Sequence, residues 1–390
     1  MRNLKTKEMT DNATVPVERE AINAIAMACA SNFGLTDMTE LYRKAGSATA
    51  VVERCRDIRA LLPDASERMV KVAAAIGDMT ERATDEYGYA QEHGIKVVTF
   101  NDNRYPARMR QCPDAPLVLF MRGNADLNSR RIVSVVGTRH CTAYGQDLTN
   151  RFVRELQTLC PQTLVVSGLA YGIDICAHNE ALNVGLPTVG VLAHGLDTIY
   201  PPRHKTVAER MVEQGGLVTE FACGTRMEKL NFVRRNRIVA GMADVTVLVE
   251  SAAHGGGLIT TRLAREYSRD VFAFPGAVGA PYSAGCNNLI RAQGARLLTS
   301  AADLVEAMGW QEDKELAVAR QQGIVRDLFP SLSPQEQAVA NLLSKHGDLQ
   351  ADTIATHLSL SIPQLTPLLF ALEMKGVVRL YAGGKYHFIS

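Results

Sequence analysis

The sequence predicts an α/β protein whose core is a doubly wound sheet of buried strands. From residue 131 onward, short β-branched runs alternate with helix-length amphipathic segments, which is the pattern of successive strand–helix units. The runs IVSVV (132–136), LVVS (164–167) and VTVLVE (245–250) are apolar almost throughout, as in parallel strands that are buried on both faces. Helix-like sequence precedes this region and a short helix-and-hairpin pattern follows it, so we expect three folded parts.

The N-terminal residues 1–95 are expected to form a helical module. Between about Val17 and Lys96, the apolar residues recur at spacings of three and four. The first strand-like segment is IKVVTF (95–100), and the first 15 or so residues have the composition of a frayed polar leader. The spacing therefore predicts helices over most of this module and no long strand.

Residues 96–310 are assigned to the α/β core. Further segments in this region that predict strands are TVGVLA (188–193), LVTEF (217–221), VFAF (271–274) and RLLTS (296–300). In doubly wound sheets, ligands bind outside the carboxyl ends of the strands. The loops that follow the strands, among them VGTRH (136–140) and SGLAYGID (167–174), are therefore the places where function is expected.

The last part of the chain predicts a winged helix. After a charged, Gln-rich linker at 311–331, residues 332–390 contain three short helical segments and two strand-like segments joined at Gly383-Gly384. This region has four basic and four acidic residues, and its expected recognition helix, SIPQLTPLLFALEMK, contains no arginine. Because winged helices commonly read DNA with a basic helix, we expect this one to add little DNA affinity and to contact protein instead.

Bulk composition excludes several function classes. The 390-residue chain has a net charge of +1, no uncharged apolar run of about 18 residues and no apolar leader, so neither a membrane span nor a secretory signal is expected. Its eight cysteines are scattered without a CxxC pair, which argues against zinc and for reduced thiols in the cytoplasm. Asp174 and His178 are four residues apart, but no third ligand is evident, so no metal or other cofactor is expected.

The densest basic stretch lies between Arg226 and Arg237, with five basic residues and one acidic residue. Phe232 lies among these cations, in what we expect to be a loop that enters a helix. Crowded cations repel one another, and a polyanion would relieve that repulsion with release of counterions. An aromatic ring among them offers a face for an unstacked base. The alternative is that Phe232 packs in the core while the arginines form a solvated face.

Glycine-containing loops follow the first two core strands. Gly137 and Arg139 come directly after the first strand, where backbone amides and a guanidinium favour an anion. Gly168 and Gly172 repeat this pattern after the next strand. The alternative is that Arg139 caps a helix or pairs with a surface carboxylate. We expect Arg139 and Phe232, about ninety residues apart, to meet on one rim of the sheet and to face the same nucleic-acid strand.

Several long motifs resemble the DNA-processing protein A family, also called DprA or Smf. They include VGTRHCTAYG, VVSGLAYGIDICAHNEAL, FVRRNRIVAGM and GGGLITTRLAREYSRDVFAFPG, and the match covers residues 95–310 strongly and both flanks loosely. The resemblance implies an extended Rossmann-like core, a SAM-like or helix-hairpin-helix-like N-terminal module and a C-terminal winged helix. It also implies a cytoplasmic homodimer, formed through the core, that protects single-stranded DNA and loads a RecA-type recombinase in natural transformation and recombination.

The resemblance also assigns nucleic-acid contacts. The family's DNA-contacting arginine corresponds to Arg139, and the lysine and aromatic residue of its K-x-x-F pattern correspond to Lys229 and Phe232. The full set of predicted contact residues is Gly137, Arg139, Gly168, Gly172, Lys229, Phe232, Arg234, Arg235, Asn236 and Arg237. The chain departs from the family at Val233, where a proline is usual, and at residues 255–257, where three glycines replace Ser-Gly-Ser.

Two other functions remain open at this point. An enzyme resembling nucleotide phosphoribohydrolases would share the Rossmann variant, but those enzymes carry PGGxGT followed by a suitably spaced glutamate, whereas this chain has AHGGGLITT with Glu250 and Glu266. A scaffold or transcription regulator would act through the winged helix and would bind duplex DNA sequence-specifically. No catalytic residue is predicted, so the leading hypothesis is a non-enzymatic single-stranded DNA-binding protein.

Overall fold

The computed structural model describes residues 17–30, 35–310, 332–347, 349–358, 360–375, 377–381 and 385–388. The chain divides into two compact units, Met1–Gln311 and Glu312–Ser390. The expected polar leader, the expected linker and the turn at Gly383-Gly384 lie outside the described residues. Within the described residues, no helix is long and apolar enough to cross a membrane.

The first unit begins with a set of short helices. They are α1 (Val17–Ala30), α2 (Leu35–Ala45), α3 (Ala48–Glu53), η1 (Cys55–Ala60), α4 (Glu67–Ala74), η2 (Gly77–Met79) and α5 (Thr80–Glu92). Ile25 and Met27 of α1 are buried where α1 packs against α3 and α5. The hydroxyl groups of Ser47 and Ser66 accept backbone hydrogen bonds at the starts of α3 and α4, which defines where these helices begin. The helical prediction for this region is confirmed.

A single sheet follows, with the strand order β1-β2-β6-β5-β4-β3-β7-β8-β9. Its strands are β1 (Lys96–Thr99), β2 (Val118–Gly123), β3 (Ile132–Val136), β4 (Leu164–Ser167), β5 (Thr188–Val191), β6 (Gly216–Thr219), β7 (Val245–Leu248), β8 (Asp270–Ala273) and β9 (Arg296–Leu297). All pairings from β6 to β9 are parallel, which confirms the doubly wound core. The pattern did not predict β2, because β2 precedes the alternating region and pairs antiparallel with both β1 and β6.

Helices cover both faces of this sheet. Those of the core are α6 (Ala107–Arg110), α7 (Ala143–Leu159), α8 (Ile173–Val184), η3 (Pro202–His204), α9 (Lys205–Gln214), α10 (Lys229–Met242), α11 (Gly256–Glu266), α12 (Ala284–Arg291) and α13 (Ala301–Ala307). Val133 and Val135 of β3 pack into a cluster with α7, α8 and α13. Ile132 and Val136, which alternate with them, face a second cluster that includes α10, α11 and the N-terminal helices.

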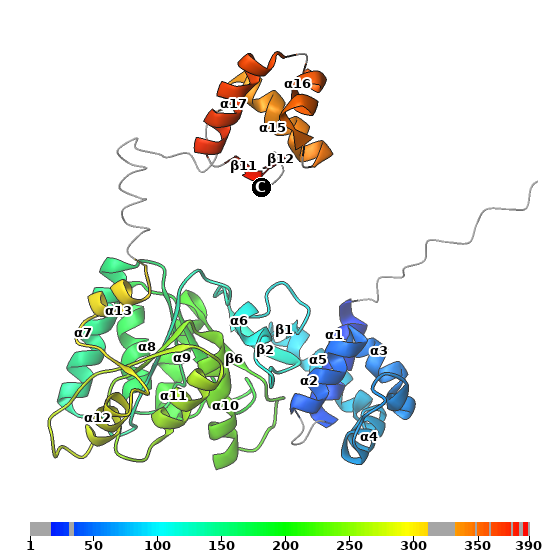
Figure 1. The fold of residues 1–390 in the computed structure, drawn as a ribbon. Coiled ribbons are helices and arrows are strands. Elements are labelled where there is room, and N and C mark those ends of the chain that lie inside the picture. The colour runs from blue at the N-terminus through cyan, green and yellow to red at the C-terminus, as the bar shows by residue number, and fades with distance from the viewer. Residues whose placement is uncertain are drawn as a thin grey trace, which may run out of the picture. The chain divides into compact units, whose positions relative to one another are not determined.

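The N-terminal helices lie beside the antiparallel end of the sheet, at β1 and β2 (Figure 1). The hydroxyl of Thr39 on α2 donates to the carbonyl of Ala115 at 2.8 Å, and the guanidinium of Arg43 donates to the carbonyl of Arg110 at 2.8 Å. These bonds join the helices to the segment that leads into β2, so the N-terminal helices and the sheet form one unit.

The strand order reverses at β3, and this reversal positions the site. The chain proceeds from β3 through β4 and β5 to β6 on one side, and then returns to β7 on the other side of β3. In open α/β sheets, a crevice forms outside the carboxyl ends of the strands at such a reversal. The loops after β3 and β7 border this crevice.

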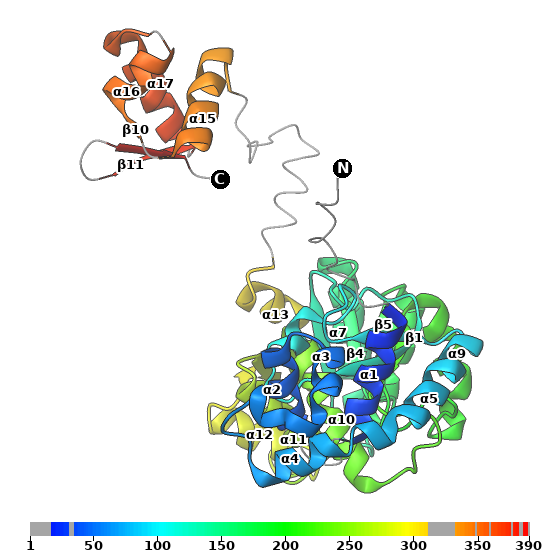
Figure 2. The same ribbon diagram turned by 90° about the vertical axis from the view of Figure 1, so that its right-hand side faces the viewer.

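The second unit is a small helix-and-hairpin domain with its own core (Figure 2). It contains α15 (Pro334–His346), β10 (Leu349–Gln350), α16 (Ala351–Leu358), α17 (Ile362–Met374), β11 (Val378–Tyr381) and β12 (Lys385–Phe388). Leu343, Ile354 and Leu369 are buried where the three helices meet. The predicted three helices and hairpin are confirmed, and the short strand β10 adds a third strand to the sheet.

Candidate nucleic-acid interface

A groove with a volume of about 800 Å³ opens at the carboxyl ends of the central strands. Its walls come from the loops after strands β3 to β8, from the first half of α10 and from the start of α11. Its lining includes Gly137, Thr138, Arg139, His140, Gly168, Asp174, Tyr200, Lys229, Phe232, Arg235, Asn236, Ser251, His254 and Tyr282. The groove therefore lies where the sheet topology places a ligand site.

Arg139 and Phe232 meet on the rim of this groove. The central carbon of the Arg139 guanidinium lies 5.4 Å from the centre of the Phe232 ring. The ring of Tyr200 packs edge-on against Phe232, with 5.9 Å between the ring centres. Arg139 is exposed and Phe232 is half-buried, so the ring is not a residue of the hydrophobic interior. The expectation that these two distant segments share one rim is confirmed.

The basic stretch is helical from its first lysine, which corrects the expectation of a loop. Helix α10 begins at Lys229, directly after an extended Glu228. Lys229, Phe232, Val233 and Asn236 recur at helical spacing and all line the groove. One face of α10 therefore presents a lysine, an aromatic ring and an amide to the groove, and it holds them at fixed separations.

Arg235 forms part of the floor of the groove rather than its rim. Its side chain is buried, with the residue 3% exposed, and its Nη1 donates to the carbonyl of Val191 at 2.6 Å. A Cβ on Gly168 would lie 1.9 Å from this guanidinium, so any other residue at 168 would displace the guanidinium from its present position. Burial lowers the pKa of Arg235 to about 10, and burial also raises the pKa of the neighbouring Asp174 carboxyl.

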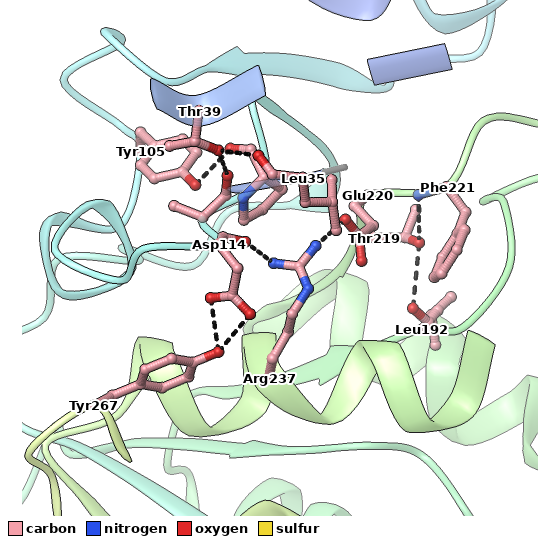
Figure 3. A network of polar contacts seen from close by, with 12 residues as sticks. Leu35, Thr39, Tyr105, Asp114, Leu192, Thr219, Glu220, Phe221, Arg237 and Tyr267 are labelled. Carbon is pink, nitrogen blue, oxygen red and sulfur yellow. Dashed lines mark hydrogen bonds and ion pairs between the residues drawn. The ribbon is translucent and has the colours of Figure 1, made fainter. Parts of the chain in front are cut away.

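Arg237 is not in the groove, so its predicted phosphate contact is wrong. It is 5% exposed, and its guanidinium forms an ion pair with Glu220 and donates to the carbonyl of Asp114. The carboxylate of Asp114 in turn accepts from the hydroxyl of Tyr267 at 2.7 and 2.8 Å (Figure 3). The residue is a structural cation, because its two partners hold it in the interior.

Arg234 also lies away from the groove. It lines a second cavity, which has a volume of about 450 Å³ and lies between α10 and the N-terminal helices. Arg234 therefore does not share the groove with Lys229, because residues 229 and 234 lie on different sides of the helix, and its predicted contact with nucleic acid stays a prediction.

The predicted glycines hold the loops close together. A Cβ on Gly137 would lie 2.5 Å from the side chain of Ile173, and a Cβ on Gly172 would lie 2.1 Å from the carbonyl oxygen of Thr138. Gly172 has a φ of +79°, a conformation that other residues rarely adopt. Gly137 and Gly168 line the groove, whereas Gly172 supports the Arg139 loop from behind.

The sequence did not predict the roles of two residues in the structure of the groove. Tyr200, which is 43% exposed, adds a second aromatic ring to the rim, although it was not among the predicted contact residues. Glu250 positions the Arg139 loop, because its buried carboxylate accepts from the amide of Thr142 at 2.9 Å and from its hydroxyl at 2.7 Å. No sequence motif marks such a contact between segments about a hundred residues apart.

The described residues contain no cluster of three metal-ligating side chains. His178, once paired with Asp174 as a possible ligand set, is buried, and its Nδ1 lies 2.7 Å from the hydroxyl of Thr188. Burial lowers the pKa of His178 to about 3, so this ring is neutral in the folded protein.

Comparison with known proteins gives consistent matches along most of the chain. A family model described as DNA recombination-mediator protein A matches residues 96–309, and a DprA winged helix domain model matches residues 328–384. The chain is 37% identical over 311 residues to a putative DNA processing protein DprA of Mycobacterium tuberculosis, covering 76% of this chain and 78% of that protein. It is 35% identical over 291 residues to Protein Smf of Escherichia coli, covering 72% and 74%.

Two solved structures are similar in fold. DNA processing protein A of Streptococcus pneumoniae aligns with a TM-score of 0.57 and 29% identity, covering 70% of this chain and 97% of that chain. DNA processing protein A of Helicobacter pylori, whose structure is described for its single-stranded DNA binding mode, aligns with a TM-score of 0.50 and 26% identity, covering 55% and 95%. Because the first family model covers more than half of the chain and both relatives exceed 30% identity over more than two thirds of it, the chain belongs to the DNA recombination-mediator protein A family, the DprA/Smf family.

Proposed function

We propose that the chain is a recombination mediator that binds single-stranded DNA in the groove. The observation that carries this proposal is the contact between Arg139 and Phe232 on the groove rim, with 5.4 Å between the guanidinium carbon and the ring centre. An exposed cation beside an accessible ring is the combination that proteins use to hold a backbone phosphate and a stacked base together. The relative from Helicobacter pylori, which is described as binding single-stranded DNA, supports the same assignment.

Different groove residues are suited to the phosphates and to the bases of the strand. Arg139 and Lys229 supply charge at the rim, and the amides of the Gly-rich loops after β3 and β7 supply hydrogen-bond donors for phosphate oxygens. Phe232 and Tyr200 offer ring faces to bases of any sequence. Asn236, one turn further along α10, adds a polar group that can bond to either a base edge or a sugar. This arrangement predicts binding with little sequence preference.

The wider role rests on membership of the family. We propose that the protein acts in the cytoplasm, protects incoming or exposed single strands and helps to load a RecA-type recombinase onto them. We also propose a homodimer formed through the Rossmann-like core. Each of these statements follows from the family resemblance. Strand protection and recombinase loading both require that the protein hold a single strand, and the groove is the place where we propose that it does so.

The second unit is proposed to contact protein rather than DNA. Of the four basic residues between 332 and 390, Lys375 is held by the carboxylate of Glu336 at 2.7 and 2.8 Å. Helix α17, at the position of a recognition helix, exposes Phe370 (65%) and Met374 (74%) instead of basic groups. Apolar side chains on an exposed helix face suit a protein surface better than a phosphate backbone.

Binding is favoured over catalysis by the positions of the candidate carboxylates. Glu250 is engaged by Thr142, and Glu266 is exposed on α11, 3.7 Å from Arg262, outside the residues that line the groove. Neither carboxylate is therefore positioned in the groove for the acid–base role that a phosphoribohydrolase requires. Release of a free base from a nucleoside monophosphate by the purified protein would revive the enzymatic alternative.

The proposal is tested by titrating the protein into labelled single-stranded and duplex oligonucleotides of equal length. The full chain and a chain that ends at residue 311 are compared, since the first unit ends there. Both proteins should prefer the single strand and should bind it with similar affinity. Preference for duplex, or binding that disappears with the second unit, would contradict the assignment of DNA binding to the groove.

A further inference from the structure

We propose that the second cavity is a further subsite for the same DNA strand, and that the N-terminal helices contribute Arg82 to it. This inference rests on the proposed single-stranded DNA-binding function. The cavity has a volume of about 450 Å³ and lies on the opposite side of α10 from the groove. Arg82 of α5 lines it from the N-terminal side, and Arg226 and Arg234 line it from the core.

The groove and the second cavity share one wall, at the start of α10. The residues of this wall that line the second cavity are Arg226, Glu228, Asn231 and Arg234. Those that line the groove are Met227, Lys229, Phe232 and Val233. A strand that leaves the groove past Phe232 therefore needs to cross only the first turn of α10 to enter the second cavity.

The charge and surface of the second cavity suit a nucleotide. The lining carries three arginines, Arg82, Arg226 and Arg234, against two glutamates, Glu220 and Glu228, and Glu220 also forms an ion pair with Arg237. Helix α10 is 14 residues long and has no side-chain cap, so its positive end adds to the attraction for phosphate at the shared wall. The cavity also has an apolar lining, from Leu35, Phe120 and Phe221, against which a base can pack.

One acidic residue of the lining, Glu220, is largely buried. The side chain of Glu220 is 8% exposed, and one of its oxygens bonds to Arg237. Its other oxygen, Oε1, has no hydrogen-bond partner among the described residues. This oxygen is enclosed by protein atoms, so the attraction of the cavity for a strand rests on its arginines and its apolar lining.

The experiment compares oligo-dT of about 4 and about 16 nucleotides, the two ends of the range of site sizes for proteins that hold single strands without sequence preference. Salt-dependent titrations are made with wild type, Arg82→Ala and Arg68→Ala. Arg68 is the matched control, because it is also an exposed arginine of the N-terminal helices and does not line the cavity. The short oligonucleotide is expected to occupy the groove alone, and the long one both sites.

Arg82→Ala should reduce the slope of log K against log salt by about 0.7 for the long oligonucleotide, which is the loss of one phosphate contact. It should leave the short oligonucleotide unaffected, and Arg68→Ala should change neither. The inference is overturned if Arg82→Ala matches Arg68→Ala on the long oligonucleotide, or if it weakens both lengths equally. Failure of wild type to bind either length would instead refute the proposed function, so the two failures are distinguishable.

Discussion

The groove face and the interior face of α10 carry the same kinds of residue and use them differently. On the groove face, Lys229 and Phe232 line the groove, as Arg139 does. On the interior face, Arg237 is 5% exposed and is held by Glu220 and the carbonyl of Asp114 (Figure 3). A cation in the groove can exchange bound water for phosphate, whereas a cation in the interior stabilises the fold. Burial and partners, rather than residue type, therefore decide which cations of one basic run can bind a ligand.

The largest effect that separates the two faces should come from Arg237→Ala. This change should lower the free energy of unfolding by about 3–5 kcal/mol, because it leaves the buried Glu220 carboxylate without its partner. Urea denaturation followed by tryptophan fluorescence measures it, since the only tryptophan, Trp310, packs against the core of the first unit. Arg237→Met combined with Glu220→Met should cost less than Arg237→Met alone. A loss below about 1 kcal/mol, the size typical of an exposed ion pair, would contradict the structural role.

On the groove face, Phe232→Ala should weaken binding to oligo-dT by about 1–3 kcal/mol, because it removes a stacking surface for one base. Its effect on the unfolding free energy should be smaller than that of Arg237→Ala, since the ring is half-buried. Fluorescence anisotropy with a labelled oligonucleotide measures the binding. Leu230→Ala is the matched control, because Leu230 is 47% exposed on the same turn of α10 and lines neither cavity. Equal losses for the two variants would exclude stacking on Phe232.

The comparison also shows what a single sequence can and cannot predict here. Apolar runs at regular intervals predicted the strands β3 to β9 and a doubly wound sheet, because burial on both faces leaves a direct signal in composition. The meeting of Arg139 with Phe232 was predictable too, because the carboxyl ends of parallel strands share one edge. Both predictions depend on rules that hold for the whole class of folds.

The errors came from details that depend on tertiary packing. The interior position of Arg237 depends on Glu220 and on the N-terminal helices, which reach the core through a segment before β2. Nothing in the run RRNR distinguishes its last arginine from an exposed one. The helical start at Lys229 was equally hidden, because Glu228 provides no capping hydrogen bond through its side chain and the basic residues break any amphipathic pattern.

The smallest predicted effect concerns Arg139. It tests whether the cation in the groove, unlike the buried Arg237, contacts a phosphate. Arg139→Ala should reduce the slope of log K against log salt for oligo-dT by about 0.7, the value for one phosphate contact with a single strand. Arg139→Lys retains the charge and should restore the slope, although it loses the planar guanidinium that lies over the Phe232 ring. Arg237→Met, measured in the same titration under conditions where it stays folded, should leave the slope unchanged, because that cation never reaches the groove. If the slope falls for Arg237→Met and not for Arg139→Ala, the phosphate contact has been assigned to the wrong arginine.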